Sequence, residues 1–273
     1  MEYKIVAMDM DDTLLTDDQK ISEKTKEAIM EAQKSGTTVV LASGRPTYAM
    51  KKFAKELELK EYGGYILSYN GSIVIDCARD EVIFENCLSQ ELALELHKIS
   101  QEHQVFYHTY IGDDIITTKN NKYTEIEYDL TGMKIIEVDN LEEKVTSNPV
   151  KALMMEDPAY LKEVEDRLRP LLESKVNLFR SKPFFLEFTA KGVDKGAMLA
   201  KLADRLGVRQ NQVIAIGDGY NDLTMIQYAG LGVAVDNAND QLKKKADYIT
   251  TSNMEDGVAK VIEEFIFAKR SIA

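Results

Sequence analysis

The sequence predicts an α/β fold with a parallel sheet that is split by an inserted α+β unit. Near the N-terminus, three short apolar runs at 3–8, 37–42 and 65–68 alternate with two segments of helical periodicity. This order is typical of right-handed βαβ units and a parallel sheet. The alternation stops near residue 85 and resumes near residue 188. We therefore expect a core of residues 1–85 and 188–273 and an inserted domain of residues 86–187.

Turn and cap residues set the boundaries of the first elements. Ser22 is a helix N-cap residue and Gly36 a helix stop, so we expect a helix over 22–35. A second helix is expected after Pro46, ending near residue 57. Asn70-Gly71 is a strong hairpin signal, and it predicts that the sheet continues with antiparallel strands. The expected antiparallel strands are 73–75 and 82–84.

The remaining elements follow from the same signals. In the inserted segment, the expected helices are 90–102, 123–130, 141–145 and 158–173, and the expected strands 105–110, 115–118, 133–137, 150–155, 176–180 and 184–188. In the C-terminal part, the expected strands are 213–216, 232–235 and 248–250, and the expected helices 195–206, one from about 221, 241–246 and 258–268.

Composition limits the classes of function. The 273 residues are 44% hydrophobic and 29% charged, as in globular proteins, and no apolar stretch approaches the ~18 residues that span a bilayer. The net charge of −12 excludes nucleic acid as the natural partner, and it would also repel phosphorylated metabolites. A phosphate site must therefore invert the local field with a metal ion, a lysine or helix N-termini.

The cysteine content and the N-terminus favour the cytoplasm. Cys77 and Cys87 are too few to cross-link a fold of this size, and no pair of cysteines has zinc-ligand spacing. The chain enters its first strand almost at once, without the pattern of a signal peptide. We expect reduced thiols in a cytoplasmic protein that does not contact a membrane.

The acidic turn after the first strand is the first sign of chemistry. Asp9, Asp11 and Asp12 follow a buried run, although neighbouring carboxylates repel each other. If the chain stays extended here, Asp9 and Asp11 point to the same side and can share a divalent cation. A solvated turn explains these residues equally well when they are taken alone.

Two further loops are expected at the same edge of the sheet, because ligands of open parallel sheets bind at the carboxyl ends of the strands. These loops are Ser43-Gly44-Arg45 and 217–222. Their residues suit phosphoryl transfer, in which one carboxylate attacks phosphorus and a second moves the leaving-group proton. The accumulated negative charge requires Mg²⁺, a hard cation that prefers oxygen ligands.

These loops resemble the four motifs of the haloacid dehalogenase-like (HAD) phosphohydrolases. In chain order, the motifs are Asp9-Met10-Asp11-Asp12-Thr13, Ser43, Lys195 and Gly217-Asp218-Gly219-Tyr220-Asn221-Asp222. Segments 43–46, 69–71, 192–196, 232–238 and 255–258 resemble the Cof-type branch, particularly its YidA-like sugar phosphatases. The resemblance implies a HAD-like Rossmannoid core and a C2-type cap formed by the insertion.

The resemblance also implies roles for the motif residues. Asp9 would be the nucleophile, Asp11 the acid/base, and Lys195 the cation that neutralises nucleophile and phosphate. The remaining substrate-binding residues would be Met10, Ser43, Gly44, Arg45, Asn70 and Asn221. Mg²⁺ would be bound by Asp9, the Asp11 carbonyl and Asp218, with Asp222 either a further ligand or an outer support.

Two motif positions depart from the common pattern. Ser43 replaces threonine, and Asp12 replaces glycine, without loss of either carboxylate role. Several residues also have an ordinary structural explanation. Lys195 could be a surface lysine, Ser43 a helix N-cap, Arg45 the partner of a core carboxylate, Asn70 a turn residue and Asp222 a favourable helix-start residue.

The sequence therefore predicts a Mg²⁺-dependent phosphatase of small phosphorylated metabolites, with sugar phosphates favoured. Tyr110 and His108 of the insertion are hypothetical sugar contacts, although half-buried strand positions explain them too. A phosphomutase on the same scaffold and a phospho-accepting signalling module are the alternatives; a binding protein without catalysis fits the retained carboxylates less well. The sequence leaves the oligomeric state open.

Overall fold

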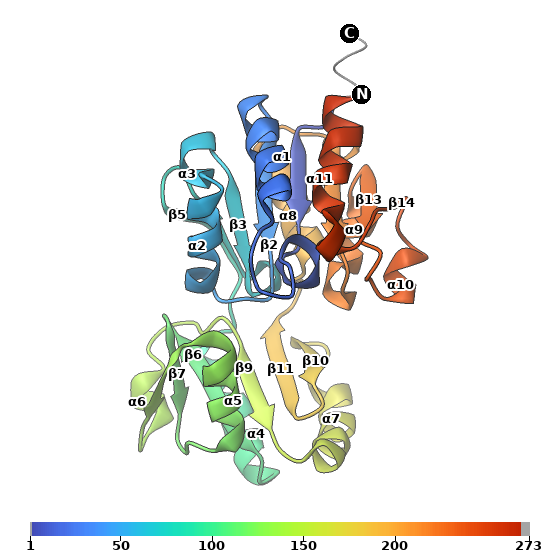
Figure 1. The fold of residues 1–273 in the computed structure, drawn as a ribbon. Coiled ribbons are helices and arrows are strands. Elements are labelled where there is room, and N and C mark those ends of the chain that lie inside the picture. Colours follow the sequence, from blue (N-terminus) through green and yellow to red (C-terminus); the bar gives the residue numbers. More distant parts are fainter. Residues whose placement is uncertain (1, 269–273) are drawn as a thin grey trace. The chain divides into compact units, whose positions relative to one another are not determined.

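In a computed structural model of the protein, which describes residues 2–268, the chain forms two units. Unit 1 is built from both ends of the chain, up to Glu85 and from Asp194 onward, and unit 2 is Asn86–Val193 (Figure 1). From the sequence, we expect the insertion to span residues 86–187. Strand β11 (Phe185–Ala190) pairs along its whole length with β10 (Val176–Lys182), so unit 2 continues beyond residue 187.

Unit 1 contains one eight-stranded sheet in the order β14-β13-β12-β1-β2-β3-β4-β5. Its strands are β1 (Ile5–Met8), β2 (Thr38–Ala42), β3 (Tyr65–Ser68), β4 (Ile73–Asp76), β5 (Glu81–Glu85), β12 (Val213–Gly217), β13 (Leu231–Ala234) and β14 (Tyr248–Ile249). Six of them run parallel, and β4 and β5 continue the sheet in antiparallel pairs, as the Asn70-Gly71 signal predicts. The central strands are buried on both faces, which explains their continuous apolar sequences.

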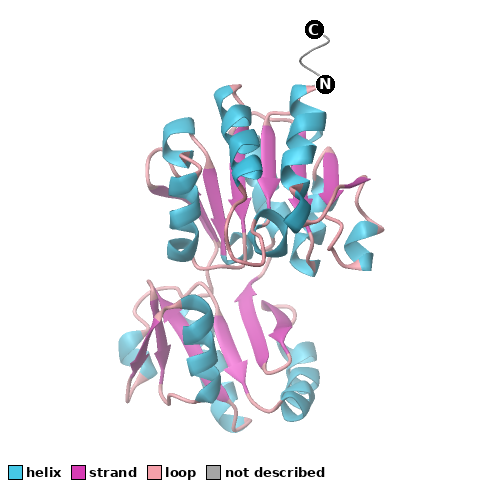
Figure 2. Ribbon diagram, viewed as in Figure 1, coloured by secondary structure: helices cyan, strands magenta, loops and turns pink. Residues whose placement is uncertain are grey.

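Helices cover both faces of this sheet (Figures 1 and 2). They are α1 (Glu23–Lys34), α2 (Thr47–Glu56), α3 (Leu59–Tyr62), α8 (Lys195–Arg205), α9 (Leu223–Tyr228), α10 (Asp240–Lys243) and α11 (Gly257–Ile262). The chain moves from β1 to β2 in one direction along the sheet and from β12 to β13 in the other. Right-handed crossovers therefore place α1 and α9 on opposite faces and create a switch point between β1 and β12.

Unit 2 contains a six-stranded sheet in the order β10-β11-β9-β6-β7-β8. The strands not yet introduced are β6 (Phe106–Ile111), β7 (Asp114–Thr117), β8 (Lys134–Glu137) and β9 (Ala152–Met155), and the helices are α4 (Gln90–Glu102), α5 (Lys122–Thr131), α6 (Leu141–Lys144) and α7 (Pro158–Leu172). Alternate residues such as Tyr107 and Leu186 join the apolar core with α4 and α7. The other face carries His108 and Tyr110, whose polar atoms meet α5.

Three local features differ from the sequence expectations. The acidic turn is not extended throughout, because Met10–Leu14 forms a helical turn in which Asp12 has φ +58°. The short helix α3 was not expected, since four residues carry too little periodicity to recognise. The C-terminal helix begins as α11 and continues as a π-helical turn over Glu263–Phe267. Within residues 2–268, no helix is long and apolar enough to cross a membrane.

Candidate active site

The candidate site lies at the carboxyl ends of β1, β2 and β12, beside the switch point of the parallel sheet. Met8, the last residue of β1, is in register with Leu41 of β2 and with Ile216 of β12. The residues that follow these strands therefore emerge together at one edge. The Asp9 amide extends the pairing by donating to the Ile216 carbonyl at 2.9 Å.

Three carboxylates from these loops converge. Asp9, Asp218 and Asp222 each offer an oxygen atom, and these atoms all lie within 4.8 Å of one another. A hydrogen bond of 2.7 Å from the Thr13 hydroxyl to Asp218 Oδ1 joins the first acidic loop to the third. Residues more than two hundred positions apart in the sequence thus form one acidic centre.

Lys195 is buried at this centre, with no exposed surface. Its ammonium group donates to Asp9 Oδ1 and to Asp222 Oδ1, the latter at 2.6 Å. Lys195 is the first residue of α8, and the Asp194 side chain caps that helix by accepting from the Ala197 amide at 2.8 Å. The explanation of Lys195 as a surface lysine is therefore wrong.

Burial and like charge dominate the electrostatics of the cluster. Burial, reinforced by Asp222, raises the pKa of Asp9 well above its usual value, although Lys195 opposes this effect. Burial also raises the pKa of Asp218 to about 6, with the Thr13 hydrogen bond acting in the opposite direction. For Lys195, burial lowers the pKa, but the attraction of Asp222 and Asp9 outweighs it and the net shift is upward. Three carboxylates facing one ammonium group leave negative charge uncompensated, and their hard oxygen atoms fit a divalent cation such as Mg²⁺.

Asp222 lies inside the third loop and organises it. Its Oδ2 accepts hydrogen bonds from the amides of Asp218 at 3.0 Å and Gly219 at 2.9 Å. A Cβ atom at Gly217 would lie 2.6 Å from the Asp222 side chain, so only glycine fits there. With its other oxygen on Lys195, Asp222 is engaged on both sides, which favours the role of a support over that of a direct ligand.

Asp11 lies apart from the three converging carboxylates. Both of its oxygens accept from the Arg45 guanidinium, whose Nε lies 2.7 Å from Oδ2, and Arg45 also donates to the Gln19 side chain. The expectation that Asp9 and Asp11 face one cation with their side chains is therefore wrong, because the chain turns at Met10. Arg45 therefore pairs with a carboxylate, as its structural explanation expects, but this carboxylate is partly exposed and does not belong to the core.

The remaining predicted substrate residues gather around the second loop. Asn221 Nδ2 donates to Asn70 Oδ1 at 3.0 Å. A Cβ atom at Gly44 would lie 3.4 Å from the Asn70 amide group, so the backbone of this loop and Asn70 are neighbours. Asn70 has φ +58° in the turn after β3, so it is also a turn residue.

Ser43, in the loop after β2, and Met10, in the acidic turn after β1, are both buried. The Ser43 hydroxyl accepts from the Arg45 amide at 3.1 Å, whereas α2 begins only at Thr47 with Pro46 as its cap residue. Ser43 is therefore not the N-cap of α2. The Met10 carbonyl accepts from the Leu15 amide at 2.8 Å and closes the acidic turn.

The structure also reveals site residues that the sequence analysis did not assign. Thr13 contacts Asp218, and Asn237, Asn239 and Asn253 donate to carbonyl groups of the two acidic loops. The segment 232–238 is part of the family resemblance, but a lone asparagine in a loop gives no sign of its partner.

In unit 2, His108 and Tyr110 are enclosed instead of available to a ligand. Both are buried, His108 Nε2 lies 3.1 Å from the Tyr110 hydroxyl, and that hydroxyl donates to Glu127 Oε1 at 2.5 Å. Their side chains stabilise the packing of α5 on the sheet, so the hypothesis that they contact a sugar is not supported.

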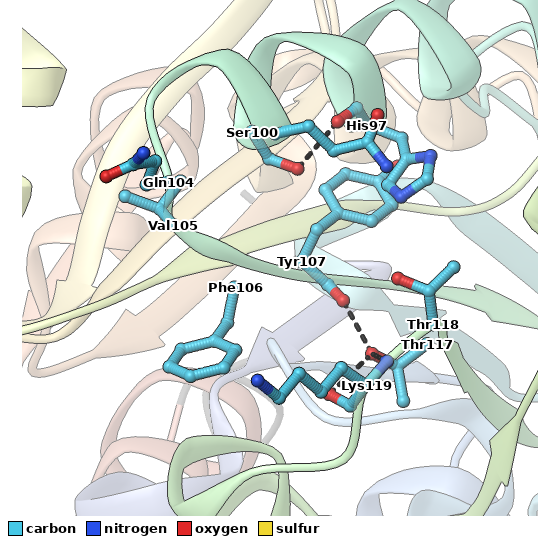
Figure 3. A pocket seen from close by; sticks show the side chains of 10 residues that line it. His97, Ser100, Gln104, Val105, Phe106, Tyr107, Thr117, Thr118 and Lys119 are labelled. Atoms are coloured by element: carbon cyan, nitrogen blue, oxygen red, sulfur yellow. Dashed lines mark hydrogen bonds between the residues drawn. The ribbon is translucent and has the colours of Figure 1, made fainter.

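Unit 2 also contains a hollow of about 290 Å³ between the end of α4 and strands β6 and β7. Figure 3 shows His97 and Tyr107 on one side and Phe106 and Lys119 on the other. The hydroxyls of Ser100 and Thr117 bond backbone carbonyls of His97 and Tyr107 at 2.7 Å each. None of the predicted site residues lines this hollow, and it contains no carboxylate side chain.

The lysine-bridged carboxylate cluster thus lies at the carboxyl ends of the parallel strands, where ligands of such sheets bind. A family model described as haloacid dehalogenase-like hydrolase matches residues 6–262. The chain belongs to this family, as the four motifs indicate, and the expected α/β fold is confirmed.

Named relatives agree with this assignment. A haloacid dehalogenase-like hydrolase from Bacteroides thetaiotaomicron is 41% identical with a TM-score of 0.88, covering 96% of this chain and 99% of that one. The Bacillus subtilis 5-amino-6-(5-phospho-D-ribitylamino)uracil phosphatase YcsE is 33% identical over 266 residues, 97% of each chain. The HAD subclass IIB sugar phosphatase BT4131 is 26% identical with a TM-score of 0.79, covering 96% of this chain and 98% of that one.

Proposed function

We propose that the protein is a Mg²⁺-dependent phosphatase that hydrolyses small phosphorylated metabolites through an aspartyl-phosphate on Asp9. The observation that carries this proposal is the buried Lys195 ammonium between Asp9 and Asp222, with Asp218 beside them. A lysine held in this way neutralises both the attacking carboxylate and the charge of an incoming phosphate. Burying an ammonium group costs free energy of desolvation, which its attraction to Asp9 and Asp222 offsets.

The chemistry divides into two transfers. Asp9 attacks phosphorus, the bond between phosphorus and the leaving oxygen breaks, and Asp11 delivers the proton to that oxygen. Asp11 then takes a proton from water, whose oxygen attacks the phosphorus of the aspartyl-phosphate and releases inorganic phosphate. Arg45 donates to both Asp11 oxygens, so one of these two hydrogen bonds must break when Asp11 carries the proton. Asp9, the Asp11 carbonyl and Asp218 would hold Mg²⁺, which would supply charge neutralisation.

The residues around the second loop bind the transferring phosphoryl group in this proposal. Ser43 and the amides of Met10 and Gly44 contact its oxygens, and Asn221 does so with Asn70 as its neighbour. These positions surround the acidic centre at the same edge of the sheet. Holding the phosphoryl group in line matters because phosphoryl transfer depends mainly on positioning and charge neutralisation.

We place the substrate among phosphate esters of polyhydroxylated carbon chains, such as sugar phosphates. Two relatives support this class: one is named a sugar phosphatase, and the other is named for a substrate whose phosphate sits on a ribityl chain. Unit 2, inserted between β5 and α8, would act as the cap that excludes water and selects the leaving group. We place the enzyme in the cytoplasm, where its two cysteines stay reduced.

Phosphate release over a panel of hexose, pentose and polyol phosphates, with Mg²⁺ or with chelator, tests the proposal. We expect release that requires Mg²⁺, and we expect Asp9→Asn to lower it by roughly 10³-fold or more. Release without any bisphosphate activator distinguishes the phosphatase from a phosphomutase. Equal turnover by Asp9→Asn and the parent enzyme would refute the role of Asp9.

A further inference from the structure

Three asparagines hold the backbone of both acidic loops. Asn237 and Asn239 belong to the loop after β13, and Asn253 lies in the short helical turn before α11. Their side-chain amides donate to main-chain carbonyls of the Asp9–Leu15 turn and of Asp218. None of the three asparagines is a proposed Mg²⁺ ligand.

The first contact fixes an unfavourable backbone. Asn237 Nδ2 donates to the Asp12 carbonyl at 2.6 Å, and Asp12 has φ +58°, a conformation that is costly for a residue with a side chain. The next residue, Thr13, donates to Asp218. The orientation of the Asp12 carbonyl is therefore linked through one residue to the Asp218 carboxylate.

The second contact holds the other end of the same turn. Asn253 is buried, and its Nδ2 donates to the Leu15 carbonyl at 2.9 Å. Its backbone amide donates to Asn237 Oδ1 at 3.0 Å. Asn237 and Asn253 thus form one connected unit that bonds the Asp12 and Leu15 carbonyls at once.

The third contact fixes the other acidic loop. Asn239 donates to the Asp218 carbonyl twice, from Nδ2 at 2.8 Å and from its backbone amide at 3.1 Å. Because Asn237 and Asn239 are two residues apart, the loop after β13 ties the first acidic loop to the third. This tie acts in addition to the direct contact between Thr13 and Asp218.

We infer that Asn237, Asn239 and Asn253 are positioning residues that set the distance between the Asp9–Leu15 turn and Asp218, and so the affinity for Mg²⁺. The inference rests on the proposed function. Partners one shell outside a metal site that orient its ligands commonly change affinity or activity 10–100-fold when they are removed. Amides suit this task because they donate to carbonyls without adding charge to an acidic centre.

Asn237 is the informative position, because its side chain is exposed and contributes little to the core. Asn237→Ala removes the donor to the Asp12 carbonyl together with the acceptor of the Asn253 amide. Asn239→Asp removes the side-chain donor to the Asp218 carbonyl but keeps the backbone donor and the acceptor that caps α10 at the Leu242 amide. Asp236→Ala is the matched control, since Asp236 is exposed in the same loop and forms an ion pair with Lys243.

The test is calorimetric titration of the full-length protein with Mg²⁺ in the absence of substrate, combined with thermal unfolding and steady-state kinetics. We expect Asn237→Ala and Asn239→Asp each to weaken Mg²⁺ binding by roughly tenfold. At saturating Mg²⁺ we expect kcat to recover most of its loss and KM to change little. Asp236→Ala should bind Mg²⁺ like the parent.

Other outcomes distinguish a failure of the positioning role from a failure of the proposed phosphatase function. Unchanged Mg²⁺ affinity in both variants, or lower unfolding temperatures with parental affinity, would overturn the positioning role and leave the phosphatase proposal intact. Failure of the unsubstituted protein to bind Mg²⁺ would overturn the proposed function, and the positioning role with it.

Discussion

Lys195 is the residue on which the electrostatics of the site depend. Its ammonium group donates to Asp9 and to Asp222, two of the three carboxylates that converge at the site. Its raised pKa means that it stays charged throughout the physiological range. Removing this cation would leave Asp9 and Asp222 facing each other without compensation.

We therefore predict that Lys195→Met loses both activity and stability. Removing one partner of a buried ion pair costs about 3–5 kcal/mol in the free energy of unfolding. The rate of phosphate release should fall by roughly 10³-fold, because charge on the nucleophile and the phosphate is no longer neutralised. Lys201→Met, an exposed position on the same helix α8, is the control for both measurements. Parental activity in Lys195→Met at a temperature where it is folded would contradict the assigned role.

At the residue scale, the sequence indicated which residues belong to the candidate active site better than it indicated their hydrogen-bond partners. The loops of Asp9 and Asp218 were singled out because they follow strands of the expected sheet, and Lys195 because the motifs resemble those of a known family. The engagement of Asp11 by Arg45, and of Asp222 by Lys195 and two backbone amides, depends on loop conformations that no local pattern encodes. Long-range contacts such as that of Thr13 with Asp218 are invisible for the same reason.

At the element scale, close packing of α8 on α9 places Lys195 at the centre. The residue after Lys195, Gly196, makes this approach possible: a Cβ atom there would lie 2.4 Å from the Thr224 carbonyl carbon and oxygen. The Gly196 amide donates to the Thr224 hydroxyl at 3.1 Å, which keeps the two segments in contact. A glycine in the first turn of a helix thus serves packing at the expense of helix propensity.

We predict that Gly196→Ala destabilises the protein although alanine is the better helix former by up to about 1 kcal/mol. Overpacking against backbone atoms costs about 1–3 kcal/mol, and α8 must shift to relieve the clash. Denaturant unfolding should show the loss, and phosphate release should fall as Lys195 moves. Gly207→Ala separates backbone strain from a clash, because Gly207 has a φ of +66° that strains alanine but open space around its Cβ position. A more stable Gly196→Ala would contradict the packing argument.

A buried histidine in unit 2 makes the folding free energy depend on pH. Burial, with a smaller contribution from Lys151, lowers the pKa of His108 to about 3, so the folded state keeps this imidazole neutral. The unfolded chain takes up the proton near pH ~6.5. Between these values the unfolded state binds more protons, and folding free energy is lost as the pH falls from about 6.5 toward 3.

We predict that unfolding free energies measured across this range fall less steeply with acid in His108→Gln than in the parent. The difference in slope should approach about 1.4 kcal/mol per pH unit, the value for one proton. Above about pH 7, the unfolding free energy should change with pH at the same rate in both proteins. Parallel curves below pH 6 would contradict the burial of His108 as a neutral group.

The elements themselves were largely predictable. Apolar β-branched runs and capping residues such as Ser22, which accepts from the Thr25 amide at 3.2 Å, mark the main strands and helices. The helical turn at Met10–Leu14 was not predictable, because its conformation follows from tertiary bonds to Asn237 and Asn253 rather than from local preference.

At the scale of the whole molecule, the charge of −12 means that a phosphate group is attracted only where the local field is reversed. The sequence predicted this conflict, and the buried ammonium group of Lys195 supplies positive charge at the site. It also predicted an insertion, but placed its end inside β11, because pairing with β10 does not show in composition.

We predict that Mg²⁺ raises the unfolding free energy of the parent protein, because the carboxylate cluster exists only in the folded chain. At a Mg²⁺ concentration of 100 times its dissociation constant, the gain should be about 2.7 kcal/mol. Asp218→Asn should lose most of this gain while its unfolding without Mg²⁺ changes little or improves, since like charge is removed. An equal gain in Asp218→Asn would show that Mg²⁺ binds elsewhere.

Rapid-quench mass spectrometry of the peptide containing Asp9, during turnover of a sugar phosphate that the enzyme accepts, tests the central claim most directly. We predict that a phosphoryl group appears on Asp9 before inorganic phosphate is released, and that it is lost at a rate equal to or faster than kcat. Turnover with no phosphorylated Asp9 at any time, or a phosphorylated Asp9 that persists without phosphate release, would contradict the account.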